Sequence, residues 1–224
     1  MLGLRSARLV FRRPGAPASV TLFPMVHVGD AAFYDAVHAD ALDHDVVLFE
    51  GVRSPVGRQL TLSYRWIDLP KLGLILQPRL RAEGNGNVRL LHADLSTDDF
   101  HACWREVPYW LRLAVVLLAP LVGLQRRLFA TRKSLAERMS LEDRLSSDEI
   151  LDWDPTWAAF RRAILGVRDE RLVAVLGEQL DQIGEGGKRL AIIYGAQHMR
   201  AVRAELSRRG FVCVESGWRT VIAL

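Results

Sequence analysis

Two histidines and a glutamate each follow a short apolar segment of this 224-residue chain. His27 comes after VTLFPM, Glu50 ends the run DVVLFE, and His198 follows RLAIIYG. Imidazole and carboxylate groups together bind divalent cations, and three protein ligands leave one coordination position for water. A metal-bound water is a nucleophile at neutral pH. If the fold brings the three segments together, these residue types predict a metal-dependent hydrolytic centre.

Each of these side chains also has a purely structural explanation. A histidine at the end of a strand can be a solvated or capped residue with no ligand. Glu50 terminates an apolar run, where an unpaired charge is costly, so it requires either a metal or a cationic partner. Arg168 lies in the middle of the apolar stripe of a long predicted helix. It can pair with Glu50, hold a substrate carboxylate or oxyanion, or pair locally with Asp169.

Other polar residues are weaker candidates. Arg53 could act as Arg168 does, Gln197 could contact substrate beside His198, and Asp94 could approach the site from the middle of the chain. We expect His44, at the opposite end of its strand, to be solvated, and Cys213 to lie in the core. The chain has no Gly-rich phosphate loop, Gly-x-Ser-x-Gly elbow or His-Glu-x-x-His helix.

The elements expected to position these groups are parallel strands. The apolar runs at 20–25, 46–50 and around 189–195 are typical of buried strands, and a helical stripe with Asp30 as N-cap connects the first two. Parallel strands end at one edge of their sheet, where open α/β sheets bind ligands. We therefore expect the two imidazoles and the carboxylate to face one crevice.

The predicted fold class is α/β, with a mixed, largely parallel sheet flanked by helices. We expect a single domain over 1–224, with its core at about 1–53 and 155–224 and a mostly helical insertion at about 54–154. Further expected elements are a hairpin of Arg8–Phe11 with Val20–Met25, a helix near Gln59–Leu69, a long helix at about Trp157–Ile183, a short helix ended by Gly210, and two last strands, FVCVES and WRTVIAL.

Composition limits the partners and the compartment. Lys and Arg number 30 against 26 Asp and Glu, and this small excess is scattered, so we expect no nucleic-acid binding. Two cysteines, Cys103 and Cys213, cannot form a disulfide framework, which favours a reducing compartment. The arginine-containing N-terminal segment has no apolar run of signal-peptide length. We expect a cytoplasmic protein that is either soluble or associated with a membrane.

One apolar stretch, Leu113–Leu124, is interrupted by Pro120 and is shorter than the roughly 20 residues needed to cross a bilayer. Two explanations are open. The segment can be a helix buried in the fold, or residues 111–124 can present an exposed apolar face that forms a homodimer or contacts a membrane surface.

Three segments together resemble the TraB/PrgY/GumN family, which is related to the Tiki proteases and more distantly to the ChaN and erythromycin-esterase-like proteins. They are FPMVHVGDAAFYDAVHADALDHDVVLFEGV, GVRDERLVAVLGEQL and YGAQHMRAVRAELSRRGF. The family pattern of two Gly-x-x-His motifs, a strand-end Glu and a helical Arg maps onto His27, His198 with Gly195, Glu50 and Arg168. The first motif departs from the pattern, because Pro24 replaces its glycine and restricts the backbone before His27.

The resemblance implies an α/β fold with divalent-metal-dependent hydrolase activity, proteolytic in the Tiki branch, with manganese or cobalt implied and zinc as the other candidate. His27, Glu50 and His198 would hold the metal, with Glu50 alternatively acting as base, and Arg168 would stabilise an oxyanion or bind a substrate carboxylate. The expected substrate is a peptide or another amide or ester. The alternative is a non-catalytic protein that binds a peptide or small ligand in the same crevice and docks through residues 111–124.

Overall fold

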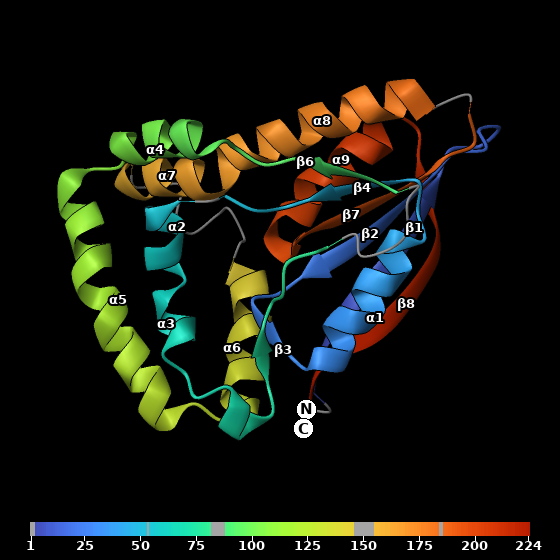
Figure 1. Cartoon of the computed structure of the whole chain (residues 1–224). Helices are drawn as coiled ribbons and strands as arrows, with labels where there is room; N and C mark the ends of the chain where they lie inside the picture. The colour runs from blue at the N-terminus through green and yellow to red at the C-terminus, as the bar shows by residue number, and fades with distance from the viewer. Residues whose placement is uncertain (1–2, 53, 82–87, 146–154, 184–185) are drawn as a thin grey trace.

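A computed structural model describes residues 3–52, 54–81, 88–145, 155–183 and 186–224. In these ranges six strands form one sheet in the order β6–β4–β7–β2–β1–β8 (Figure 1). Their bounds are β1 Gly3–Arg12, β2 Ser19–Met25, β4 Val46–Phe49, β6 Arg89–His92, β7 Arg189–Gly195 and β8 Val212–Ala223. A separate pair joins β3 (Val28–Gly29) to β5 (Ile75–Leu76).

The centre of the sheet is parallel. Strand β7 pairs in parallel with both β2 and β4, and β4 pairs in parallel with β6, whereas β1 runs antiparallel to β2 and β8. Helix α1 (Ala31–Leu42) connects β2 to β4, and β7 lies between these two strands. The predicted α/β class, with a mixed and largely parallel sheet, is confirmed.

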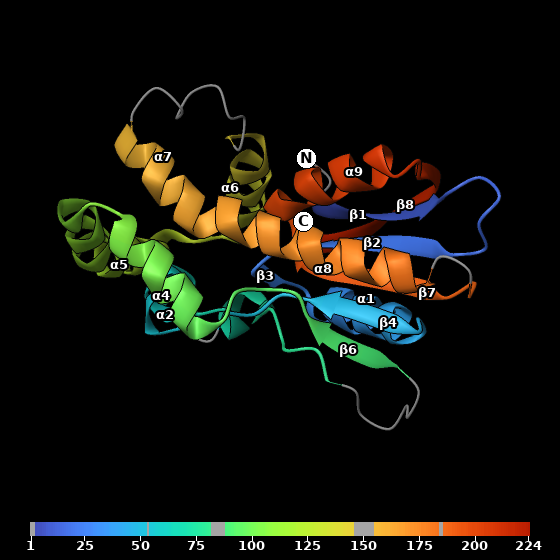
Figure 2. The same cartoon turned by 90° about the horizontal axis from the view of Figure 1, so that it is seen from above.

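Alternate residues of the central strands face two helical layers. In β7, Leu190 and Ile192 pack toward α8 (Val167–Ile183) and α9 (Met199–Arg208), whereas Ala191 and Ile193 join the cluster of α1. Figure 1 shows α8 and α9 on one side of the strands and α1 on the other, and in the view of Figure 2 α1 lies behind β4. Because successive side chains of a strand point to opposite faces, a continuous apolar run is what a sheet covered on both faces requires.

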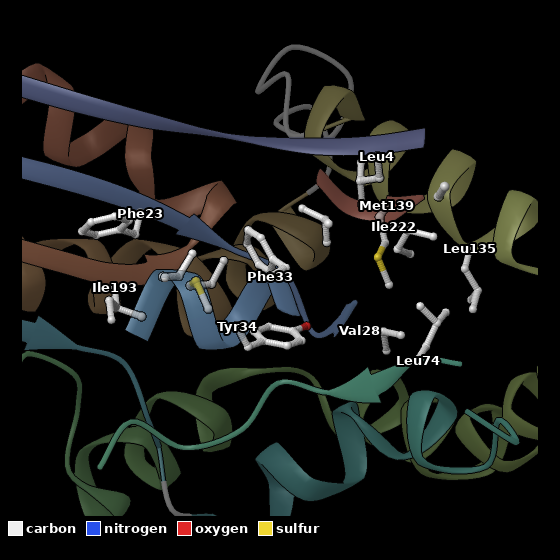
Figure 3. Close-up of a cluster of buried hydrophobic side chains, with 14 of the residues drawn as sticks. Leu4, Phe23, Val28, Phe33, Tyr34, Leu74, Leu135, Met139, Ile193 and Ile222 are labelled. Atoms are coloured by element: carbon white, nitrogen blue, oxygen red, sulfur yellow. The ribbon is translucent and has the colours of Figure 1, made fainter. Parts of the chain in front are cut away.

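The cluster on the α1 face also includes the helix α6 (Arg132–Leu145). Figure 3 shows Phe33 and Tyr34 of α1 in the same cluster as Leu135 and Met139 of α6. An ion pair reinforces this contact, since Nη2 of Arg132 donates to both oxygens of the Asp30 carboxylate, at 2.8 and 3.0 Å. Asp30 precedes α1 as predicted, but its side chain binds Arg132 and does not cap the helix.

The helices between β4 and α8 lie largely beyond the carboxyl ends of the parallel strands (Figure 1). They are α2 Pro55–Leu60, α3 Leu62–Arg65, α4 Thr97–Glu106, α5 Tyr109–Phe129, α6, and α7 Pro155–Arg161. A π-helical segment, Arg162–Gly166, joins α7 to α8. The long helix expected at 157–183 is therefore interrupted by this π-helical turn, and α8 begins directly after it, one residue before Arg168.

Three expectations about local structure are wrong. The two last strands are one continuous strand, β8, at the edge of the sheet. Cys213 lies on that strand and is exposed. His44 is buried, because its ring bonds to the Thr21 hydroxyl and to the Asp40 carbonyl oxygen, both at 2.9 Å. In addition, no sequence pattern predicts strand β6. Asp94 follows the carboxyl end of this strand.

The apolar stretch 111–124 lies in α5, and most of its leucines are exposed. Leu117 and Leu121 are 60% and 62% exposed, so the explanation as a helix buried in the fold is wrong. No single helix among the described residues is long and apolar enough to cross a membrane. Taken together, α4 and α5 are long and apolar enough, but they are bent by 111° at their junction.

Candidate active site

Four polar side chains follow the carboxyl ends of the four parallel strands. Glu50 comes directly after β4, His27 after β2, Asp94 after β6, and His198 after the turn that begins at Gly195. The pairing registers align these ends, with Met25 opposite Gly195 and Phe49 opposite both Ile193 and His92. The structure thus places the predicted imidazoles and carboxylate along one sheet edge.

A cavity of about 1690 Å³ opens at this edge. Its lining includes His27, Glu50, Arg168 and His198 on the side of the sheet, and residues of α2 and α3 from the insertion. Gln197 is exposed and also lines the cavity. Arg53 lies outside the described residues.

Arg168 joins two acids that come from different strands. Its guanidinium donates to Asp94 Oδ1 and Oδ2 at 2.9 and 2.8 Å and to Glu50 Oε1 at 2.9 Å. The Asp94 side chain is completely buried, and backbone amides of Gly51 and Leu95 also donate to it. Of the explanations for Arg168, pairing with Glu50 is confirmed and pairing with Asp169 is wrong.

The second oxygen of Glu50, Oε2, accepts a hydrogen bond from the backbone amide of Gly195. A Cβ atom on Gly195 would lie 3.1 Å from Oε2 and 3.4 Å from Cδ2 of His198. Glycine is needed here for close approach and not for backbone freedom, since Gly195 has a φ of −51°. The carboxylate and the imidazole therefore flank a single backbone position.

Glu50 is an ionised carboxylate at neutral pH. Burial raises its pKa, but the charges of Arg168, His198 and His27 and the hydrogen bond from Arg168 together hold the pKa below its ordinary value. Asp94 behaves similarly, because the hydrogen bonds and charge of Arg168 outweigh the effect of burial and lower its pKa. The site is a buried cation between two carboxylates.

His198 is oriented by a carboxylate from α8. Its Nδ1 lies 2.6 Å from Asp169 Oδ1, and its ring meets the Tyr194 ring edge-on at a centroid distance of 4.8 Å. Arg168 and Asp169 are adjacent on one helix but bind different partners. Arg168 binds the two strand-end acids, and Asp169 binds the histidine. Sequence reasoning missed this role of Asp169. Its position beside Arg168, on a helix facing the strand ends, was the only signal.

His27 is exposed on the cavity wall. Its ring lies 5.6 Å from the Tyr64 ring of α3, and its carbonyl oxygen accepts from the Gln77 amide. Pro24 fits the strand that precedes it. Its carbonyl oxygen accepts from the Ser6 hydroxyl, so its nitrogen faces β1, and the β1–β2 register ends at Leu22. The proline therefore displaces no ladder hydrogen bond on that side.

The divalent metal expected from the sequence stays a prediction at this site. The described residues contain no group of three or more His, Cys, Asp or Glu side chains placed to hold a cation. Both Glu50 oxygens bind other partners, and Nδ1 of His198 binds Asp169. His27, Glu50 and His198 line one cavity without forming a coordination sphere.

The charged lining of the cavity is strongly basic. Among the described lining residues, Glu50 is the only carboxylate, and Arg168 neutralises it. The arginines of the lining are Arg5, Arg58, Arg65, Arg79, Arg168, Arg200 and Arg203. A cavity wall of this composition attracts anionic groups.

Comparison with known proteins finds no matching family model, no matching curated protein and no matching solved structure. The resemblance to the TraB/PrgY/GumN family therefore stays a prediction.

Proposed function

We propose that the protein is a hydrolase of peptide bonds or of other amide or ester bonds, with the cavity at the sheet edge as its active site. The observation that supports this most is the pair His198–Asp169, which lies beside the ionised Glu50 on the cavity wall. A histidine oriented by a carboxylate is the usual arrangement of a general base.

In the proposed reaction, Asp169 accepts the hydrogen bond of Nδ1 and fixes the tautomer of His198. Nε2 is then unprotonated and accepts a proton from a water molecule, whose oxygen attacks the substrate carbonyl carbon. When the tetrahedral intermediate collapses, the bond to the leaving nitrogen or oxygen breaks and His198 returns the proton to that atom. The products are a carboxylic acid and an amine or alcohol.

Glu50 and Arg168 have supporting roles in this scheme. The lowered pKa makes Glu50 a weak base, so its task is to accept a hydrogen bond from the attacking water and orient it. Arg168 is a positioning residue, because its guanidinium is occupied by Glu50 and Asp94 and holds the carboxylate in place. His27, at the same sheet edge, donates to the oxygen that becomes negative.

The basic lining supports a substrate that has a carboxylate or another anionic group. Such a group would bind to arginines of the insertion, such as Arg58, Arg65 and Arg79, while the scissile bond lies at the sheet edge. This replaces the direct substrate contact expected of Arg168, whose donors are already used.

The test is hydrolysis of paired fluorogenic amides and esters that differ only in one carboxylate. We expect turnover of the anionic member of each pair, and loss of turnover in His198→Gln with the fold retained by circular dichroism. His101→Gln is the matched control, since His101 binds the Ser54 hydroxyl and is not part of this cavity's lining. Equal rates for wild type and His198→Gln would overturn the proposal.

The alternative is a binding protein that uses the same cavity without turnover. Its support is that Arg168 already pairs with both carboxylates, and that the cavity is large. Glu50→Gln separates the two. If the Glu50→Gln variant binds an anionic peptide but no longer hydrolyses it, the protein is an enzyme. If the wild type binds the peptide and does not hydrolyse it, the protein is a binding protein. The divalent ion stays a prediction, and no step above depends on it.

A further inference from the structure

Helix α5 presents a continuous apolar face to solvent at the margin of the molecule (Figure 1). Its exposed side chains recur every three or four residues, which places them on one side of a helix. They are Trp110, Leu113, Leu117, Leu121, Leu124 and Leu128. At 1.5 Å per residue this stripe is about 27 Å long.

The opposite side of α5 accounts for its place in the fold. Gly123 is buried, and a Cβ atom there would lie 3.2 Å from the Trp66 ring, next to α3. Leu111 is also buried, in a cluster with Trp104 and Val107. The inner side of α5 therefore makes its contacts with the rest of the fold. Folding does not require leucines on the outer side of the helix. Exposed apolar area of this extent marks an interaction surface.

The charges around this face select the partner. Helix α5 contains no acidic residue, and its exposed basic side chain is Arg127. Arg126 turns inward, where it donates to the Ser63 hydroxyl and lies over the Tyr64 ring of α3. Exposed Lys133 follows the helix, and the exposed pair Arg105 and Glu106 precedes it. The aromatic residues Tyr109 and Trp110 start the helix and Phe129 ends it. Leucines between basic residues, with aromatic rings at the ends, are the composition of helices that lie in a membrane interface.

A second copy of the chain fits this surface less well. Two α5 helices packed together would leave Arg127 of each helix with no acidic residue of the other α5 to pair with. An anionic lipid surface offers negative charge along the whole length of α5. The 111° bend between α4 and α5 favours a helix that lies along the membrane over one that crosses it.

We propose that the outer face of α5 docks on the surface of anionic lipid bilayers, with the helix axis in the plane of the membrane. The leucine stripe enters the acyl boundary, Tyr109 and Trp110 lie at the level of the headgroups, and Arg127 and Lys133 at the carboxyl end of the helix bind lipid phosphates. This surface is separate from the residues assigned to hydrolysis, so the proposal stands or fails independently of that function.

The test is co-sedimentation of the full chain with vesicles of phosphatidylcholine alone and with equimolar phosphatidylglycerol. We expect binding to the anionic vesicles that weakens as salt is raised. Leu117→Glu with Leu121→Glu should reduce binding by about tenfold or more, because two leucines that would enter the bilayer are replaced by charges. The matched control is Val212→Glu with Val214→Glu, which changes two exposed apolar residues of β8 and should bind normally.

Three results would overturn the proposal. The first is a wild-type protein that binds neither vesicle type. The second is a dimer, measured by light scattering, that the α5 double variant dissociates while the wild type binds no vesicles, which would assign the face to self-association. The third is an equal loss of binding in the α5 and β8 variants. Turnover of a soluble substrate should be unchanged in the α5 variant, which separates this outcome from failure of the hydrolase proposal.

Discussion

Nδ1 of His198 lies 2.6 Å from a carboxylate oxygen of Asp169, which ties the turn after β7 to helix α8. The preceding residue of α8, Arg168, binds Glu50 after β4. One helix therefore positions the acid and the histidine of the proposed site, and the relative placement of the two depends on α8 staying in register with the sheet.

Asp169→Asn should remove the orientation of His198 without unfolding the protein. An amide can donate to Nδ1 and so stabilise the wrong tautomer, in which Nε2 has no free lone pair. We expect hydrolysis to fall by about 100-fold or more. Glu170→Gln, a change of the neighbouring exposed acid, is the control for rate and stability. Equal rates in the two variants would show that the His198–Asp169 pair has no role in turnover.

Arg168→Met should destabilise the protein strongly, because it leaves two carboxylates at a mostly buried site without a cation. The side chains of Arg168 and Glu50 are 12% and 19% exposed, and that of Asp94 is fully buried. We expect a loss of about 3–5 kcal/mol in the free energy of unfolding, measured with urea. Arg189→Met removes a solvent-exposed pair with Asp43 and should change little. A small loss in Arg168→Met would mean that the acids are neutralised in another way.

The same ion-pair cluster predicts a dependence of stability on pH. The folded-state pKa values of Glu50 and Asp94 are lowered, so their stabilisation is complete above the unfolded values near about 4 and is lost as the pH falls through the folded values. We expect unfolding free energy in urea to drop below about pH 4 in the wild type. The drop should be smaller in a Glu50→Gln variant. Parallel curves for both proteins would contradict the assignment.

Gly195→Ala should damage the site more than the fold. The new methyl group would lie 3.1 Å from Oε2 of Glu50, an oxygen whose carboxylate is held by Arg168 and cannot withdraw freely. We expect a clear loss of turnover and a stability loss of about 1–3 kcal/mol. Gly217→Ala is the control, because a methyl group there meets no atom within 4 Å. Full activity in Gly195→Ala would separate Glu50 from the reaction.

The divalent ion predicted from the sequence can be tested on the same protein. After treatment with a chelator, Mn²⁺, Co²⁺ or Zn²⁺ is added and the Tm is measured. Because the oxygens of Glu50 are held by Arg168 and Gly195, we expect no rise in Tm and no change in turnover. A rise that His27→Ala and His198→Ala each remove would show that the ligands regroup around an ion, and would restore the metal-dependent mechanism.

The strand ends could be predicted from local pattern. Short apolar runs followed by His27, Glu50 and Gly195 identified β2, β4 and β7, since strands covered on both faces must be apolar throughout. Strand β6 has no such pattern, because its residues lie at the edge of the sheet and are only partly buried. For that reason Asp94 was a weak candidate, although it is the most deeply buried member of the cluster.

The sequence by itself determined the α/β class and the placing of polar groups at the ends of apolar strands, because periodicity and strand composition act over a few neighbouring residues. Only the tertiary structure decided which charges meet. Arg168 binds acids that lie 74 and 118 positions away along the chain, and Asp169 binds a histidine 29 positions away. Such partners are chosen by the order of strands and the seating of α8 on the sheet. Burial makes the choice energetically decisive, because a charge removed from water must find its counter-charge.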